Sequence, residues 1–142
     1  MNRMRRLCFT MPVAIIGLSA CGNSTTSNSA PTGQQEQLPM DMTVQDLAAR
    51  LDRGDNVMVL DVRSPEEYVQ DGHVKGSVLI PLPDLAMRLK EVPTNRPIAC
   101  FCRSGNRSQV AADLLRQNGY TNVANVLGGI KGWRAANLPT EF

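Results

Sequence analysis

One segment of the 142-residue chain places a nucleophile in a setting suited to chemistry. Cys102 follows a short apolar stretch, Pro97 to Phe101, and begins a loop that leads into a helical pattern. In a strand–loop–helix turn, successive backbone N–H groups and the positive end of the helix face one concave space, which favours anions. The sequence therefore predicts an anion-binding loop with a cysteine at its first position. Its other members are Arg103, Ser104, Gly105, Asn106, Arg107 and Ser108.

A cysteine at that position is expected to ionise more readily than a free one, because the amides and the helix dipole stabilise its thiolate. The thiolate is the nucleophilic form, so Cys102 is the candidate catalytic residue. Arg103 and Arg107 supply guanidinium groups suited to oxyanions, and Gly105 allows a backbone conformation that a side chain would hinder. The same loop would hold a persulfide, whose outer sulfur is also anionic. The alternatives are a buried, inert Cys102 and solvated arginines.

Apolar runs and helix signals alternate along the chain from Met40 onward. Short, wholly apolar runs are typical of strands covered on both faces. Thr43 with Asp46, and Ser64 with Glu67, have the spacing of an N-cap and its N3 partner, so each pair predicts a helix start. We expect a parallel sheet of about five strands with helices on both faces and ligands beyond the carboxyl ends of the strands. The predicted strands cover residues 57–60, 78–80, 97–101 and 123–127, and the later predicted helices cover residues 84–90, 109–117 and 130–136.

The order of these segments resembles the rhodanese family over about Met40 to Phe142. The matching motifs are Asp61–Tyr68, Gly72–Ser77, the loop Cys102–Ser108 and Leu127–Trp133. The resemblance implies a rhodanese-like α/β domain, a persulfide on Cys102 and sulfur transfer by that residue. It also implies a small donor such as thiosulfate or a persulfide, and an acceptor that is cyanide or a thiol. We expect no cofactor and no metal ion.

Loop length separates this reading from phosphate chemistry on the same fold. Cys102 and Arg107 have the spacing Cys-x4-Arg, whereas phosphatases and arsenate reductases of this kind use Cys-x5-Arg. In the family's terms, the shorter loop suits one extra sulfur rather than a tetrahedral oxyanion. Two other functions stay open: a non-catalytic or redox-sensing module for an envelope partner, and thiol–disulfide oxidant defence that uses Cys100 and Cys102.

Several residues near the motifs have a structural and a functional interpretation. Asp61 and Arg63 are expected to brace neighbouring loops as a supporting pair. His73 is expected to be packed rather than a general acid or base, and Trp133 to lie in the core. Cys100 departs from the family pattern, which is commonly aliphatic there. It is either a small core residue or a thiol that resolves an oxidised Cys102.

The N-terminus has the pattern of a secretion signal over residues 1–20. A basic segment, Met1 to Arg6, precedes an apolar stretch that is too short for a membrane span, which needs ~20 residues. The sequence Leu18-Ser19-Ala20-Cys21 resembles the bacterial lipobox, which implies lipidation of Cys21 and attachment to a membrane. The alternative is an ordinary signal cut near Ala20 that leaves Cys21 as a free thiol. We therefore expect a lipid-anchored protein of the bacterial cell envelope, with its domain in the periplasm.

Composition divides the rest of the chain into two parts. Residues 21–39 are rich in small polar residues, glycine and proline, so we expect a flexible tether. Residues 40–142 form the expected single domain. The chain has 15 basic and 13 acidic residues; without its three N-terminal arginines, 12 basic and 13 acidic remain. This near-neutral balance gives no reason to expect a nucleic-acid partner, and we expect a monomer.

Overall fold

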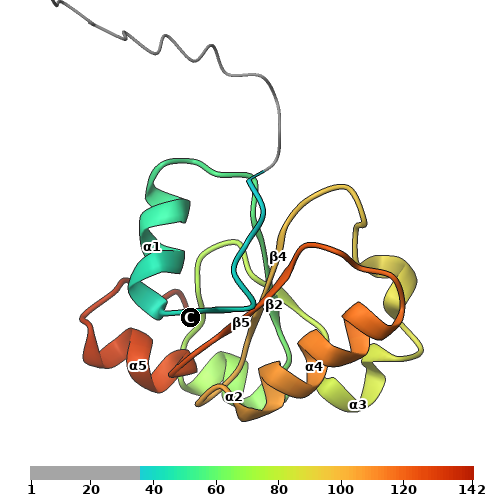
Figure 1. The fold of residues 1–142 in the computed structure, drawn as a ribbon. Helices are drawn as coiled ribbons and strands as arrows, with labels where there is room; N and C mark the ends of the chain where they lie inside the picture. Colours follow the sequence, from blue (N-terminus) through green and yellow to red (C-terminus); the bar gives the residue numbers. More distant parts are fainter. Residues whose placement is uncertain (1–35) are drawn as a thin grey trace, which may run out of the picture. The chain divides into compact units, whose positions relative to one another are not determined.

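The computed structural model describes residues 36–142 (Figure 1). They form a parallel five-stranded sheet in the order β1-β5-β4-β2-β3. This confirms the predicted fold class. The predicted signal peptide, Cys21 and most of the predicted tether lie outside the described residues. The strands are β1 (Asp41–Met42), β2 (Met58–Asp61), β3 (Val78–Leu79), β4 (Ile98–Phe101) and β5 (Val123–Val126). The helices are α1 (Val44–Asp52), α2 (Pro65–Gln70), α3 (Leu82–Leu85), a 3-10 turn (Leu89–Glu91), α4 (Asn106–Gln117) and α5 (Gly129–Ala135).

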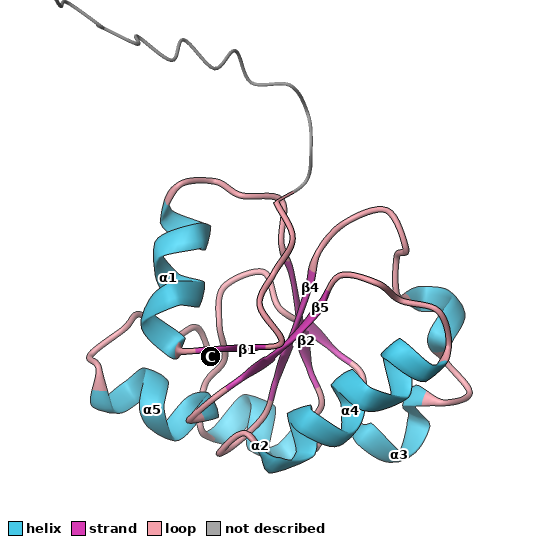
Figure 2. Ribbon diagram, viewed as in Figure 1, coloured by secondary structure: helices cyan, strands magenta, loops and turns pink. Residues whose placement is uncertain are grey.

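Helices cover both faces of the sheet (Figure 2). Side chains of successive strand residues alternate between the faces, so β2, β4 and β5 each contribute side chains to two separate cores. On one face, Ala99 and Phe101 pack with residues of α1 and α5, including Leu47 and Trp133. On the other face, the strand residues pack with α3 and α4. Every residue of β2, β4 and β5 is buried, which explains the apolar runs that predicted these strands.

The predicted helix starts of α1 and α2 are confirmed as capping boxes. Thr43 accepts a hydrogen bond from the backbone N–H of Asp46, and the Asp46 side chain accepts one from the N–H of Thr43. Ser64 and Glu67 exchange the same pair of bonds at the start of α2. Each box satisfies two N–H groups that have no partner inside the helix.

Three elements differ from the sequence predictions by more than one residue. The predicted helix over residues 84–90 is wrong, because the chain forms α3 at Leu82–Leu85 and a separate 3-10 turn. The helix after Cys102 begins at Asn106, directly after the loop, rather than at residue 109. Strand β1 has two residues and no local pattern; it forms because Asp41 and Met42 pair with β5.

The packed part of the chain also begins before Met40. Leu38 is 4% exposed and belongs to the core shared with α1 and α5. Its backbone N–H donates to Asn122, and Gln37 donates to the carbonyl of Thr121. The predicted tether, which ran to residue 39, is therefore too long at this end, because an apolar side chain anchors it. No helix within residues 36–142 is long and apolar enough to cross a membrane.

Candidate active site

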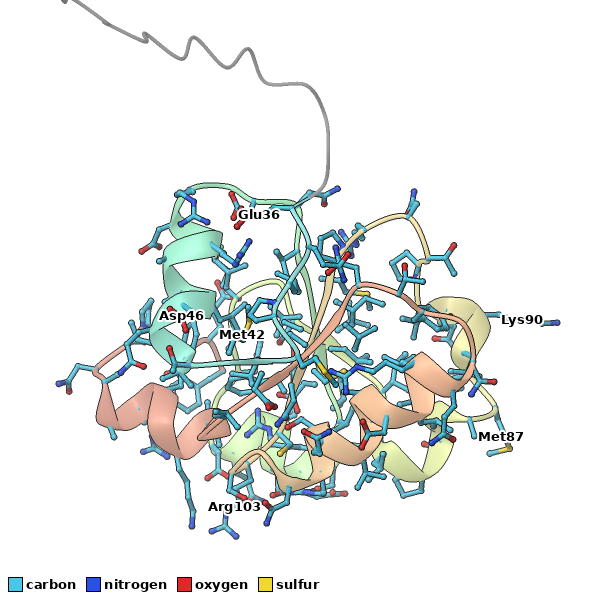
Figure 3. The ribbon with its side chains drawn as sticks, viewed as in Figure 1. Glu36, Met42, Asp46, Met87, Lys90 and Arg103 are labelled. Atoms are coloured by element: carbon cyan, nitrogen blue, oxygen red, sulfur yellow. The ribbon has the colours of Figure 1, made fainter. Side chains whose placement is uncertain are left out.

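Cys102 lies directly after β4, and four residues later α4 begins. The loop between them turns through Gly105, the N-cap of α4, whose φ of 107° lies in the left-handed region. A residue with a side chain adopts this backbone conformation only at an energetic cost, so glycine suits the position. Cys102 is 1% exposed, whereas Arg103, Ser104 and Asn106 are exposed. Figure 3 places Arg103 at the outer edge of the molecule.

The start of α5 holds the loop through two backbone hydrogen bonds. The backbone N–H of Ile130 donates to the carbonyl of Cys102 at 2.9 Å, and that of Lys131 donates to the carbonyl of Arg103 at 3.2 Å. Gly129 allows this close approach: a Cβ there would lie 2.2 Å from the carbonyl oxygen of Cys102. Two loop carbonyls are thereby engaged by α5, which leaves amides of the loop for the sulfur.

The Cys102 Sγ accepts a hydrogen bond from the backbone N–H of Gly105 at 3.1 Å. It also lies 3.3 Å from the hydroxyl oxygen of Ser108. Burial raises the pKa of the Cys102 thiol, but hydrogen bonds from Ser108 and from the backbone of Ser104 and Gly105 outweigh burial, so the pKa is lowered. The loop therefore stabilises the thiolate, which is the reactive form.

Ser108 continues the network away from the sulfur. Its hydroxyl oxygen lies 2.7 Å from Asn125 Oδ1 on β5 and 3.0 Å from the carbonyl oxygen of Gly105. The Asn125 Nδ2 donates to Asp41 Oδ1 on β1 at 3.0 Å. Ser108 and Asn125 are both buried. Sequence reasoning missed Asn125, although a polar residue inside an otherwise apolar strand signals a required hydrogen bond.

Arg107 binds a carboxylate rather than standing free. Its two terminal nitrogens contact Glu67 Oε2 and Oε1 at 2.6 and 2.7 Å, which joins α4 to α2. These bonds lower the pKa of Glu67 to about 2 and raise the pKa of Arg107. The charge of Cys102 also acts on Arg107. Glu67 therefore has a second role beyond the capping box, and its spacing in the sequence gave no sign of that role.

Asp61 and Arg63 form a fully buried pair at the end of β2, with side chains 0% exposed. The Arg63 Nη2 contacts Asp61 Oδ2 at 2.8 Å and donates to the Gly72 carbonyl at 2.8 Å, while Nη1 donates to the Glu67 carbonyl. Arg63 thus ties the end of β2 to α2 and to the turn that follows α2. These contacts agree with a supporting role.

Cys100 and Cys102 lie in the same core, which α4 covers. Cys100 is 0% exposed, and burial raises its pKa to about 12. Both properties favour the interpretation of a core residue. Both cysteines are free thiols.

His73 and Trp133 both pack against other side chains. His73 stacks on Tyr68 with ring centroids 3.9 Å apart, and Trp133 is 2% exposed in the core. Within residues 36–142 no group of three or more His, Cys, Asp or Glu side chains could hold a metal ion.

This fold and loop define a known class of domain. The Rhodanese-like domain family model matches residues 43–136, and the chain belongs to that family. The chain is 36% identical over 95 residues to a sulfurtransferase of Allochromatium vinosum, covering 67% of this chain and 88% of that one. It is 36% identical over 86 residues to the thiosulfate sulfurtransferase GlpE of Pseudoalteromonas translucida, covering 61% and 80%.

Solved structures agree with this assignment. A rhodanese-related protein from Thermoplasma volcanium has a TM-score of 0.66 and 31% identity, covering 72% of this chain and 98% of that one. Other relatives are longer: the chain spans 59% and 50% of two matching Bacillus subtilis proteins.

Proposed function

We propose that the protein is a sulfurtransferase in which Cys102 carries sulfane sulfur as a persulfide. The observation that carries this proposal is the contact of Cys102 Sγ with the Gly105 N–H and the Ser108 hydroxyl, in a loop that begins a helix. Hydrogen-bond donors around one sulfur stabilise an anion without a neighbouring base. The names of two relatives, a sulfurtransferase and a thiosulfate sulfurtransferase, support the same chemistry.

The reaction has two steps, with thiosulfate as the proposed donor. The Cys102 thiolate attacks the outer sulfur of thiosulfate, the S–S bond of thiosulfate breaks, and sulfite leaves with the bonding electron pair. Cyanide or a thiolate then attacks the outer sulfur of the persulfide, and Cys102 leaves as a thiolate. The backbone N–H groups of loop residues 103–108 hold the outer, anionic sulfur. Arg103 is exposed beside Cys102, so we assign it to the incoming anion.

Intact mass spectrometry tests this function. Incubation with thiosulfate should add one sulfur to the wild-type domain and none to Cys102→Ser, and cyanide should remove that sulfur as thiocyanate. Cys100→Ser is the matched control, because it alters the other thiol of the domain and should still gain the sulfur. A wild-type protein that gains no sulfur and forms no thiocyanate would refute the proposal.

We also propose, from the sequence Leu18-Ser19-Ala20-Cys21, that a lipid on Cys21 holds the domain on the periplasmic side of a bacterial envelope membrane. Stable anchoring takes more than one acyl chain, as the lipobox resemblance implies. Membrane fractionation of the full chain tests this. Cys21→Ala should move the protein out of the membrane fraction, and a variant that still partitions with membranes would contradict the proposal.

A further inference from the structure

The hydroxyl of Ser108 has one proton and three neighbours that can accept it. Its oxygen lies 2.7 Å from Asn125 Oδ1, 3.0 Å from the Gly105 carbonyl oxygen and 3.3 Å from Cys102 Sγ. The Gly105 carbonyl already accepts the backbone N–H of Gln109. Asn125 is therefore the nearest acceptor, and it competes with the sulfur for the same proton.

Asp41 determines which end of the Asn125 amide faces Ser108. The Asp41 carboxylate can only accept hydrogen bonds, so the Nδ2 of Asn125 points to it, at 3.0 Å. The amide oxygen must then point to Ser108. Because Asn125 is 3% exposed, no bulk water competes for that oxygen.

We propose that Asn125 is a positioning residue that draws the Ser108 hydroxyl away from the Cys102 sulfur. Ser108 donates to Asn125 while the sulfur is uncharged, and it must leave Asn125 to donate to the thiolate. Asn125 thus keeps the thiolate less stabilised than the loop alone would allow. A less stabilised thiolate is more basic and, in thiol exchange, a stronger nucleophile.

In the proposed sulfur transfer, the competition for the Ser108 proton affects sulfur uptake and sulfur release in opposite ways. This part of the inference rests on the proposed function. In the persulfide the negative charge lies on the outer sulfur, so Sγ no longer needs the Ser108 proton, and Ser108 returns to Asn125. Asn125 therefore favours the persulfide over the free thiolate. It assists sulfur uptake, in which Cys102 attacks, and opposes sulfur release, in which Cys102 leaves.

Of the ionisable groups around the loop, Asp41 accepts a hydrogen bond from Asn125 and loses it in Asn125→Leu; the same replacement in the Ser108→Ala background loses it equally and so controls for its effect. The other ionisable groups around the loop are Asp61 on β2, Glu67 on α2, Cys100 on β4, Arg103 in the loop and Arg107 on α4.

The rate of Cys102 alkylation by iodoacetamide, measured across pH, tests the competition without any sulfur chemistry. Asn125→Leu removes the competing acceptor, and a net hydrogen bond changes an equilibrium by roughly fivefold. We expect the midpoint of the profile to move to lower pH. The rate should rise roughly twofold to threefold below the midpoint and fall roughly twofold on the plateau, because a less basic thiolate reacts more slowly. Loss of the reaction in Cys102→Ala assigns it to Cys102, because Cys8, Cys21 and Cys100 remain in that variant.

Ser108→Ala supplies the control that separates competition for the Ser108 proton from a merely structural effect of Asn125. Without the hydroxyl the midpoint should move to higher pH, and adding Asn125→Leu should then change nothing. A midpoint that stays or rises in Asn125→Leu, or an equal downward move in the Ser108→Ala background, would overturn the proposal. Asn125→Val, whose branched side chain suits a strand, repeats the test if the leucine variant does not fold.

Single-turnover measurements with thiosulfate and then cyanide test the second part. Asn125→Leu should slow sulfur uptake and speed sulfur release, measured at a pH above the alkylation midpoints of the wild type and of the variant. Equal changes in both steps would refute the directional role. A wild-type protein that takes up no sulfur would refute the proposed function, while the alkylation profiles would still decide the competition for the Ser108 proton.

Discussion

Gly129→Ala should destabilise the protein more than another glycine replacement with the same backbone strain. Gly129 has a φ of 51°, and a Cβ there would lie 2.2 Å from the Cys102 carbonyl oxygen and 2.6 Å from the Arg103 carbonyl carbon. Gly54 has a φ of 77°, and a Cβ there would meet nothing within 4 Å. Gly54→Ala therefore measures the strain of the backbone conformation alone. The difference between the two variants isolates the clash of a Cβ at position 129 with the loop that begins at Cys102.

The expected magnitudes follow from these contacts. The left-handed conformation costs a side-chain-bearing residue roughly 1–2 kcal/mol, and both variants share that cost. In Gly129→Ala the loop must also move by about 1 Å to reach ordinary contact, and overpacking of this kind costs about 1–3 kcal/mol. The movement strains the hydrogen bonds from Ile130 and Lys131 to the loop carbonyls, each worth about 1 kcal/mol. We expect a loss of about 4 kcal/mol for Gly129→Ala and about 1 kcal/mol for Gly54→Ala.

Urea unfolding, followed by far-UV circular dichroism, measures both variants under the same conditions. The midpoint for Gly129→Ala should fall well below that of Gly54→Ala. The alkylation rate of Cys102 gives a second readout, which should change in Gly129→Ala and stay at the wild-type value in Gly54→Ala. Equal destabilisation of the two variants would refute the reasoning, because it would mean that the loop adapts to a Cβ at Gly129 without cost.

Three further predictions concern the groups around the loop. Asp61→Asn should lower the free energy of unfolding by about 3 kcal/mol, because it removes the nearer charge partner of the buried Arg63 guanidinium and leaves only Asp71, at 4.0 Å, among its ion pairs within residues 36–142. Glu67→Gln should cost about 1 kcal/mol or less at pH 7, because the pair with Arg107 is partly exposed. The folded pKa of Glu67, about 2, lies below its ordinary 4.5, so the pair stabilises fully above pH 4.5 and the difference from wild type should close as pH falls toward 2. Cys100→Ala should leave the alkylation rate of Cys102 unchanged, because Cys100 is buried and uncharged.

Each of these predictions has a control or an excluding result. Asp113→Asn breaks a surface pair with Arg116 and should cost less than about 1 kcal/mol; equal losses at Asp61 and Asp113 would contradict the role of burial. If the free energies of unfolding of Glu67→Gln and wild type still differ at pH 2, the ion pair with Arg107 is not the source of the difference. For Cys100, oxidised protein that yields a disulfide between Cys100 and Cys102 in peptide mapping would contradict its assignment as a core residue.

The sequence alone determined the features that depend on neighbours along the chain. Capping boxes need partners three residues apart, so Thr43 and Ser64 marked the starts of α1 and α2 correctly. The buried strands were visible as apolar runs because both of their faces are covered. The loop from Cys102 was recognisable because a strand end, a glycine and a helix start follow one another directly.

The tertiary structure decided which residues meet across elements. Glu67 and Arg107 are 40 positions apart, and they meet because β4 pairs beside β2, which brings α4 next to α2. Asn125 reaches Ser108 because β5 is the other neighbour of β4. Gly129 lies against the Cys102 carbonyl for the same reason. No local pattern encodes the order of strands in a sheet, which follows from how all the apolar faces are buried together. The sequence thus marked Cys102 as the candidate nucleophile, and the sheet order determined which residues lie around its sulfur.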